Sequence, residues 1–434
     1  MNSLCRFPWR QLPLAMAAAC AAWAGSALAQ SYDGGLPRLA FAADPPQPAI
    51  MNPAKIPLST KAVAPAPTPA TAPPAPASDL SKAASSNWDG NHGGCGCDNG
   101  CGCGMCCCCP TFYAYGSGLI MSRDMPNTYM TTFQTGNNVN QLQGTADTGA
   151  SWGGGFEVGI GWNVCCDNAV ELSYFGIWGI NGTADLYDPN NQLSTPMDTG
   201  NVYLPDSSHP AGNYFDNARE HRITREDQVN NVELNWIYHA LDSKSCNSLN
   251  VDLIAGIRWF NFSEKLEFAS LAGSTAAGNH IGDDPANTAY LDVNVDNNLV
   301  GFQVGSKVDW KAWDRLSMFV TPKFGVYGNH MTSHSSLTRG DGAKGVFTDS
   351  GDTFDLHASK NVVSFMASAD LGVNYDITSN WSVFGGYRVV AVTGVALSDN
   401  QIYPFLAGEA DYNALKSNGS LILHGVFIGS EFRW

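Results

Sequence analysis

Residues 153–180 read GGGFEVGIGWNVCCDNAVELSYFGIWGI and contain the pattern that decides the fold. Two alternating runs flank the short polar turn CCDN. From 156 to 162 every second residue is apolar, and the residues between them are glycine or glutamate. The run from 170 to 178 alternates in a similar way. Because successive side chains of a strand point to opposite faces, the stretch predicts an antiparallel hairpin with one apolar face.

Similar alternation recurs along the rest of the chain. We expect ten strands, at 111–121, 153–163, 168–179, 229–240, 249–262, 298–310, 316–327, 362–375, 381–392 and 421–434. Such strands suit a soluble sandwich, whose apolar faces point inward, and equally a transmembrane barrel, whose apolar faces point to lipid. Alternation alone does not separate these two folds.

The connections between the strands separate them. Short connections at 165–168, 242–248, 311–314 and 376–380 alternate strictly with long ones at 122–152, 181–228, 263–297, 328–361 and 393–420. Outer-membrane barrels have short periplasmic turns and long outer loops, whereas a sandwich has no reason to alternate in this way. The sequence therefore predicts an all-β fold, an antiparallel up-and-down transmembrane barrel of about ten strands, or twelve if the loops hide two more.

Aromatic residues support the barrel. They gather near the predicted strand ends, as in the two aromatic girdles of such barrels: Trp162, Trp178, Trp236, Tyr238, Trp259, Trp310, Trp313, Tyr375 and Trp381. The chain ends in an alternating strand with Phe432 and Trp434. This ending resembles the assembly signal that the outer-membrane insertion machinery reads, so we expect that machinery and outer-membrane lipid as partners.

The N-terminus is typical of an exported protein. Arg6 and Arg10 precede a short apolar stretch at 12–24, and residues 27–29 (ALA) form a small-residue cleavage site, which predicts a cleaved signal peptide at 1–29. Cys20 as a lipoprotein cysteine is the weaker alternative, since 17–19 are all alanine where a leucine is usual. No later stretch offers the roughly 18 continuous apolar residues of a spanning helix. We therefore expect the protein in the cell outer membrane.

Two further segments precede the barrel at 111–434. Residues 30–86 are rich in Pro and Ala, which predicts an extended disordered linker, either a plain tether or a segment that touches the cell wall. Residues 87–110 are rich in Cys and Gly, and two further cysteine sites lie in short turns. In an exported protein we expect disulfides within or between chains, cross-links to envelope proteins included, with soft-metal binding by thiolates as an alternative. The disulfide candidates are Cys95, Cys97, Cys101, Cys103, Cys106, Cys107, Cys108, Cys109, Cys165, Cys166 and Cys246.

Three stretches also resemble a known family. FYAYGSGLIMSRDMPN at 112–127, WGGGFEVGIGWNV at 152–164 and NAVELSYFGIWG at 168–179 are similar to the putative beta-barrel porins of planctomycete bacteria, of the type numbered seven. The resemblance covers roughly 111–434, and the Cys-Gly cluster also looks like members of the group. It implies an outer-membrane barrel with inferred pore activity. It supplies no catalytic motif, so it implies no site residue.

The polar faces of the strands predict the lining of the lumen. The candidates are Glu157, Glu171, Glu233, Asp252, Arg258, Lys307, Lys323, Asp370, Arg388, Glu431 and Arg433. Both signs are present, and buried charges must be paired, so these residues form either a ladder of salt bridges or a charge-lined polar pore. Ten strands suggest a narrow or plugged lumen, because aqueous channels appear near sixteen. The two ends of the long connection 263–297, at 263–268 and 289–296, are expected to continue the neighbouring strands as a hairpin above the membrane.

The functional hypotheses belong to different classes. The first is a porin for passive diffusion of small polar solutes; the alternative is a structural or surface-binding envelope barrel with a closed lumen, whose solvated loops offer no obvious apolar patch. We expect no enzymatic activity. The candidate acidic and histidine residues, His330, His334, Asp352 and His357, are expected on or beside one long loop, and no nucleophile motif accompanies them. We also expect no cofactor, no metal and no nucleic-acid partner. The formal net charge of −16 argues against a nucleic-acid partner.

Overall fold

The computed structural model describes residues 112–434 except 125–127, 166, 206–209, 242–248 and 404–413. The predicted signal peptide, linker and Cys-Gly segment lie outside the described residues, as do Cys166 and Cys246. Those predictions, and any pairing of the cysteines, stay predictions. Within the described residues, no helix is long and apolar enough to cross a membrane.

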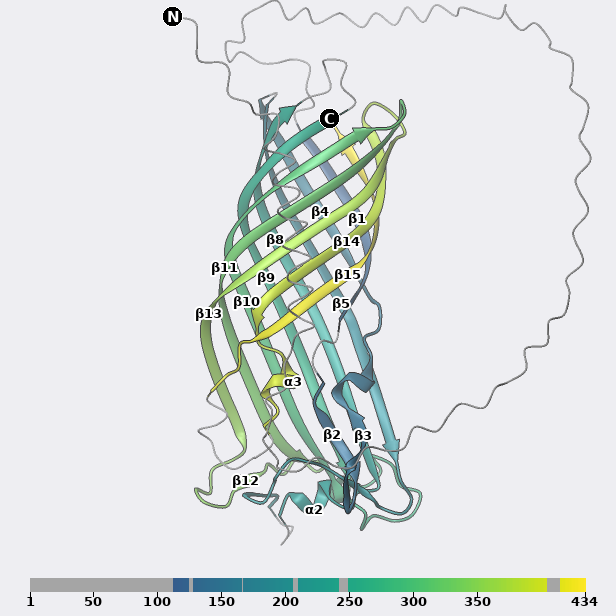
Figure 1. The fold of residues 1–434 in the computed structure, drawn as a ribbon, viewed down its shortest axis with the longest axis vertical. Helices are drawn as coiled ribbons and strands as arrows, with labels where there is room; N and C mark the ends of the chain where they lie inside the picture. The colour runs from purple at the N-terminus through teal and green to yellow at the C-terminus, as the bar shows by residue number, and fades with distance from the viewer. Residues whose placement is uncertain (1–111, 125–127, 166, 206–209, 242–248, 404–413) are drawn as a thin grey trace, which may run out of the picture. The chain divides into compact units, whose positions relative to one another are not determined.

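Ten antiparallel strands form a closed barrel, and Figure 1 shows them inclined to the barrel axis. They are β1 (Phe112–Arg123), β4 (Gly153–Cys165), β5 (Asn168–Tyr187), β8 (Glu220–Leu241), β9 (Leu249–Leu271), β10 (Thr288–Lys311), β11 (Leu316–Arg339), β13 (Asp355–Asp376), β14 (Trp381–Val395) and β15 (Gly419–Arg433). Each strand pairs with its neighbours in this order, and β1 pairs with β15 to close the ring. The predicted fold class and strand number are confirmed.

The alternating hairpin has the orientation that its pattern predicts. Phe156, Val158 and Ile160 are each 46–49% exposed on the outside of β4, whereas Glu157 is 8% exposed on the inside. The glycines between them make room for aromatic rings from β1. A Cβ on Gly159 would lie 2.3 Å from the Tyr115 ring, and a Cβ on Gly161 would lie 2.0 Å from the Tyr113 ring. The glycine face is therefore the inner face, filled by tyrosines of the neighbouring strand.

Several strands run far beyond the length that a bilayer requires. β10 and β11 have 24 residues each, while about 9–11 residues suffice to cross. Their outward residues are apolar up to Val300 and Val326 and then polar, as at Asp296 and Thr332. The expected hairpin extension of β9 and β10 is thus present. The expected long loop at 328–361 is wrong in extent, because β11 continues to Arg339 and β13 begins at Asp355.

Most of the remaining described segments lie toward one end of the barrel, which we call the loop end; the chain terminus Trp434 lies at the other, the short-turn end (Figure 1). They include a three-stranded sheet of β2 (Met130–Gln134), β3 (Asn137–Gly144) and β6 (Leu193–Ser194), and a pair of β7 (Val202–Tyr203) and β12 (Val346–Phe347). Short helices are η1 (Thr145–Thr148), α2 (Gly212–Phe215), η2 (Pro285–Asn287) and α3 (Ser398–Gln401).

The loops contribute an apolar core, contrary to the expectation that they are merely solvated. Phe215 of α2 stacks on Phe268 of β9 with ring centroids 5.5 Å apart, and both side chains are fully buried. Their neighbours in this cluster, which we call the cap core, come from loops and barrel walls alike: Met197, Val202, Leu204, Ala211, Tyr214, Ile223, Leu266, Leu291, Val293, Leu337, Phe347, Phe354, Leu356 and Ile402. The loops thus turn many of their apolar residues into the barrel mouth.

Candidate functional site in the barrel lumen

A cavity of about 500 Å³ opens at the short-turn end of the lumen, and we call it the lumenal chamber. Its wall carries most of the predicted lumen-lining residues: Glu157, Glu171, Asp252, Lys307, Lys323, Asp370, Arg388, Glu431 and Arg433. Tyr113 and Tyr115 of β1 also line it, and the Tyr113 hydroxyl donates to Glu171 over 2.9 Å. The strand alternation therefore brings charges from distant parts of the chain to one chamber.

Glu233 and Arg258, the other two candidates, are buried deeper. Glu233 is 4% exposed and accepts a hydrogen bond from Lys323 Nζ at 2.7 Å, while Arg258 Nε lies 3.5 Å from its carboxylate. Amides of Asn235 and Gln303 donate to the same carboxylate at 3.1 and 2.8 Å. Every charge in this group has an opposite charge beside it, as burial requires.

Arg388 joins two carboxylates across the lumen. It contacts Asp370 through Nε and Nη2 at 2.8 and 2.9 Å, and its Nη2 lies 3.1 Å from Glu157. Its guanidinium also lies over the rings of Phe175 and Phe427, 5.2 and 5.5 Å from their centroids. A planar guanidinium suits both contacts at once. These pairs form the salt-bridge ladder that was one of the two expectations for the lining.

A second group of charges, which was not predicted from the sequence, lies farther toward the loop end. This buried charge cluster consists of Arg123, Arg225, Asp227, Glu264 and Asp399. Glu264 accepts from Arg123 at 3.0 Å and from Arg225 at 2.7 Å, and Arg225 also pairs with Asp399. All of these side chains are 3% exposed or less. Their positions fall in the expected long connections, and residues 221–229 (HRITREDQV) carry no polar–apolar alternation that would have marked a strand there.

The connection between β14 and β15 enters the lumen at this level. Gly394 has φ +75°, a left-handed conformation that favours glycine, and its carbonyl accepts from Ser364 Oγ at 2.7 Å and from Asn329 Nδ2 at 3.1 Å. The chain turns inward there. We call residues 395–402 the plug segment.

Inward-facing polar groups hold the plug segment in place. The Asn297 side chain donates to the Ala396 carbonyl at 2.9 Å and accepts from the Ala396 amide at 2.8 Å. The Ser398 amide donates to Glu264 at 2.8 Å. Ala396 and Leu397 are fully buried. The plug segment is therefore bonded to β9 and β10 from inside the barrel, and the Arg225–Asp399 pair adds β8.

Loop residues fill the lumen beyond the plug segment as well. His221 on β8 is fully buried, with its Nδ1 2.8 Å from the Thr132 hydroxyl of β2 and its ring against Phe268. Burial lowers the pKa of His221 to about 3, so this imidazole is neutral at ordinary pH. The chamber, the charge cluster with the plug segment, and the cap core follow one another along the barrel.

The histidines considered for an enzyme lie elsewhere. His330 and His334 belong to β11 and His357 to β13, so their assignment to a loop is wrong. His330 bonds the Asn361 side chain at 2.8 Å, while His334 and His357 both lie beside Asp355 rather than Asp352. They project from the outer wall, away from the lumen, because the intervening Ser333 and Ser335 are buried inside. The absence of an enzymatic activity stays a prediction.

Comparison with known proteins identifies the family. A family model described as putative beta barrel porin-7 matches residues 134–434, more than half of the chain. The chain belongs to this family. The resemblance seen in the strand motifs is confirmed, and the protein is an outer-membrane β-barrel. No match was found among curated proteins.

Several solved structures are similar to this porin-7 family member at low sequence identity. The outer membrane protease OmpT from Escherichia coli is 12% identical, with 75% of this chain and 97% of that chain covered and a TM-score of 0.39. A major outer membrane protein from Thermus thermophilus is 11% identical, with 74% and 99% covered and a TM-score of 0.26. The translocator domain of autotransporter NalP from Neisseria meningitidis is 8% identical, with 75% and 88% covered and a TM-score of 0.31.

Proposed function

We propose that this porin-7 family member is an envelope barrel with a closed lumen, which acts through its outer wall and its loops. One observation carries the proposal: the plug segment is hydrogen-bonded inside the lumen between the buried charge cluster and the cap core. A solute that diffuses along the lumen would have to pass these buried groups. Buried ion pairs resist such displacement, because removing one partner of a pair costs about 3–5 kcal/mol.

The long strands favour a surface role. β10 and β11 each have about 13 residues beyond the roughly 11 that cross the bilayer. At about 3.4 Å per residue and a 35–45° tilt, these residues raise the loops roughly 30 Å above the bilayer. A rigid wall that carries loops to this height suits contact with other envelope components. Crossing the bilayer alone requires only about 9–11 residues per strand.

The cysteines suggest how the barrel is fixed in the envelope. Eight of the chain's 13 cysteines lie at 95–109, on the side of the chain that enters β1 at the short-turn end. In an oxidising compartment such a segment supports disulfides to neighbouring envelope proteins or to a second copy. Thiol-dependent multimers on gels run with and without reductant test this part of the proposal; a monomer in both lanes would remove it.

Passive diffusion of small polar solutes is the second candidate. The lumenal chamber favours it, since its charges of both signs face a cavity of about 500 Å³ at the short-turn end. Such a lining suits small polar solutes. For this activity the plug segment would have to leave the lumen.

Single-channel conductance of the full chain, folded in a planar bilayer, tests the two candidates against each other. A closed barrel gives no steady ohmic current, while a heat-modifiable gel band demonstrates that the barrel is folded. Steady conductance of the folded protein would overturn the closed-lumen proposal and support diffusion. Rare openings that become frequent in Asp399→Asn would identify the plug segment as a gate.

A further inference from the structure

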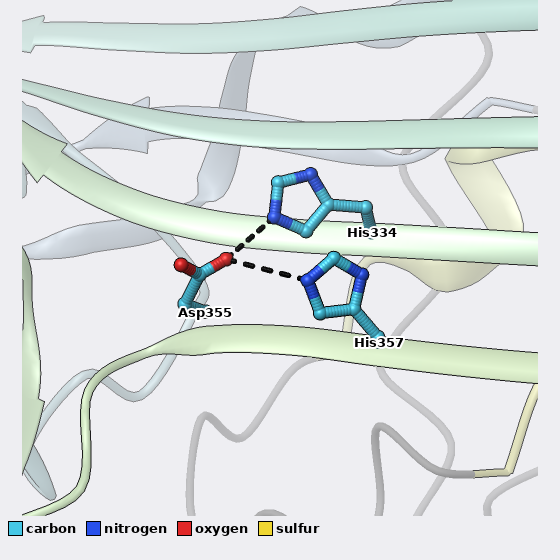
Figure 2. Close-up of side chains that lie close together, drawn as sticks. All are labelled: His334, Asp355 and His357. Atoms are coloured by element: carbon cyan, nitrogen blue, oxygen red, sulfur yellow. Dashed lines mark hydrogen bonds and ion pairs between the residues drawn. The ribbon is translucent and has the colours of Figure 1, made fainter.

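Three potential metal ligands meet on the outer wall near the loop end. His334 lies on β11, and Asp355 and His357 lie on β13 (Figure 2). One ligand atom from each residue lies within 4.8 Å of the others. None of the three takes part in the lumen, so the cluster is independent of the closed-lumen proposal.

The sheet register explains why these residues meet. His334 is directly opposite His357, and Ser336 is opposite Asp355. Asp355 and His357 are two residues apart, so both side chains project from the same face of β13. That face is the outer one, where the His357 side chain is 72% and the His334 side chain 37% exposed. The donors are therefore held by paired strands rather than by a loop.

The side chains already point at a common place. The imidazole rings stack with centroids 4.3 Å apart and planes 7° from parallel. As Figure 2 shows, both rings present Nε2 to the same carboxylate oxygen: His334 Nε2 lies 2.6 Å and His357 Nε2 3.7 Å from Asp355 Oδ1. Ligand atoms in a tetrahedral zinc site are about 3.3 Å apart, as metal–ligand distances near 2.0 Å require. Small rotations of exposed rings suffice to reach that spacing.

The surroundings prepare the carboxylate and leave space for further ligands. Lys344 Nζ donates to Asp355 Oδ2, the carboxylate oxygen that faces away from the histidine rings. The carboxylate is thus oriented by a second group, as metal-bound carboxylates commonly are. A hollow of about 240 Å³ beside the rings is lined by polar residues, among them Asn294, Asp296 and Thr332. Water or an external ligand fits there.

We propose that His334, Asp355 and His357 form a surface site for a divalent transition metal, Cu²⁺ or Zn²⁺. Two imidazoles and one carboxylate suit ions of this borderline softness and leave coordination positions open. The alternative is that these three residues bind no metal and form an ordinary hydrogen-bonded group on the solvent-exposed outer wall. The open positions face the exterior, so the site takes a metal ion from outside the cell or links the barrel to a ligand that itself binds metal.

Cu²⁺ titration of the full chain, followed by electron paramagnetic resonance, tests the site. The cysteines are first reduced and then alkylated with iodoacetamide, before refolding in detergent, so that thiolates neither bind nor reduce the metal. We expect one tight equivalent of Cu²⁺ with hyperfine coupling to two nitrogens. His334→Gln/His357→Gln loses this equivalent, whereas His330→Gln, a matched change of an outward histidine on the same strand, retains it.

Other outcomes of the Cu²⁺ titration would refute the proposed metal site. Absence of a nitrogen-coupled equivalent in the wild type overturns the proposal, as does an equal stoichiometry in the wild type and the double variant. If the double variant does not fold, Asp355→Asn replaces it, and its Cu²⁺ affinity is expected to fall at least about tenfold. Unchanged affinity in a folded Asp355→Asn protein would exclude Asp355 from the site and refute the proposed ligand set.

Discussion

Replacing Arg225 by methionine should destabilise the folded barrel by about 3–5 kcal/mol. Arg225 is 1% exposed and contacts both Glu264, at 2.7 Å, and Asp399 of the plug segment. Methionine fills a similar volume but carries no charge. The buried charge cluster would then hold three carboxylates against Arg123 alone, and removal of one partner from a buried ion pair costs this amount. We expect the loss as a lower free energy of unfolding in urea, followed in detergent by gel mobility and tryptophan fluorescence.

Arg222→Met provides the matched control on the same strand. Arg222 is 31% exposed and pairs with the exposed Asp185, and such a pair contributes at most about 1 kcal/mol. It also contacts the buried Glu220, which keeps its contacts to His280 and the Ile281 amide when Arg222 is replaced. The effect of Arg225→Met should also shrink as pH falls, because protonation neutralises the surplus carboxylates. Equal destabilisation by the two substitutions, or a loss at Arg225 that does not change with pH, would refute the charge-pairing argument.

Three further outcomes test other parts of the structure. His221 binds a proton in the unfolded chain near pH 6.5 but in the folded chain only near pH 3, so the folded state loses about 1.4 kcal/mol of stability for each pH unit below 6.5. The urea midpoint of His221→Gln should therefore depend less on pH between 6.5 and 4.5 than that of the wild type. An equal pH dependence of the two midpoints would contradict this. Gly394→Ala should cost about 1–2 kcal/mol in urea unfolding because φ is +75°, whereas Gly118→Ala, with open space around it, should be neutral. Trp434→Ser should reduce insertion into outer membranes, scored by heat-modifiability after expression, more than Trp313→Ser does; equal insertion would remove the terminal signal.

Strand number and sidedness could be predicted because the membrane imposes them on the sequence. Lipid contact requires apolar side chains at every second position, which is visible at Phe156, Val158 and Ile160. The polar partners of such residues then face the lumen, as Glu157 and Arg388 do. Long and short connections are equally visible in one sequence. These features need no knowledge of three-dimensional contacts.

The strand ends beyond the membrane could not be predicted in the same way. There the outer face is polar and the inner face is mixed, as in the series Ile223, Arg225, Asp227, so the pattern that marks a lipid-facing strand disappears. The plug segment was missed because its contacts join residues far apart in sequence, Arg225 with Asp399 and Asn297 with Ala396. The grouping of His334, Asp355 and His357 on the outer wall depends on the register between β11 and β13, which places His334 opposite His357. Sequence alone does not determine that register.

The closure of the barrel has a mechanical consequence. β1 pairs along its length with β15 on one side and β4 on the other, and Phe112 and Trp434 exchange backbone hydrogen bonds of 3.1 and 2.9 Å at the seam. A load applied through the chain that precedes Phe112 pulls β1 along its own axis. Such a pull shears both ladders at once, so many hydrogen bonds must fail together instead of opening one after another. The first strand is therefore a strong anchor point, suited to a barrel that is held from its N-terminal side.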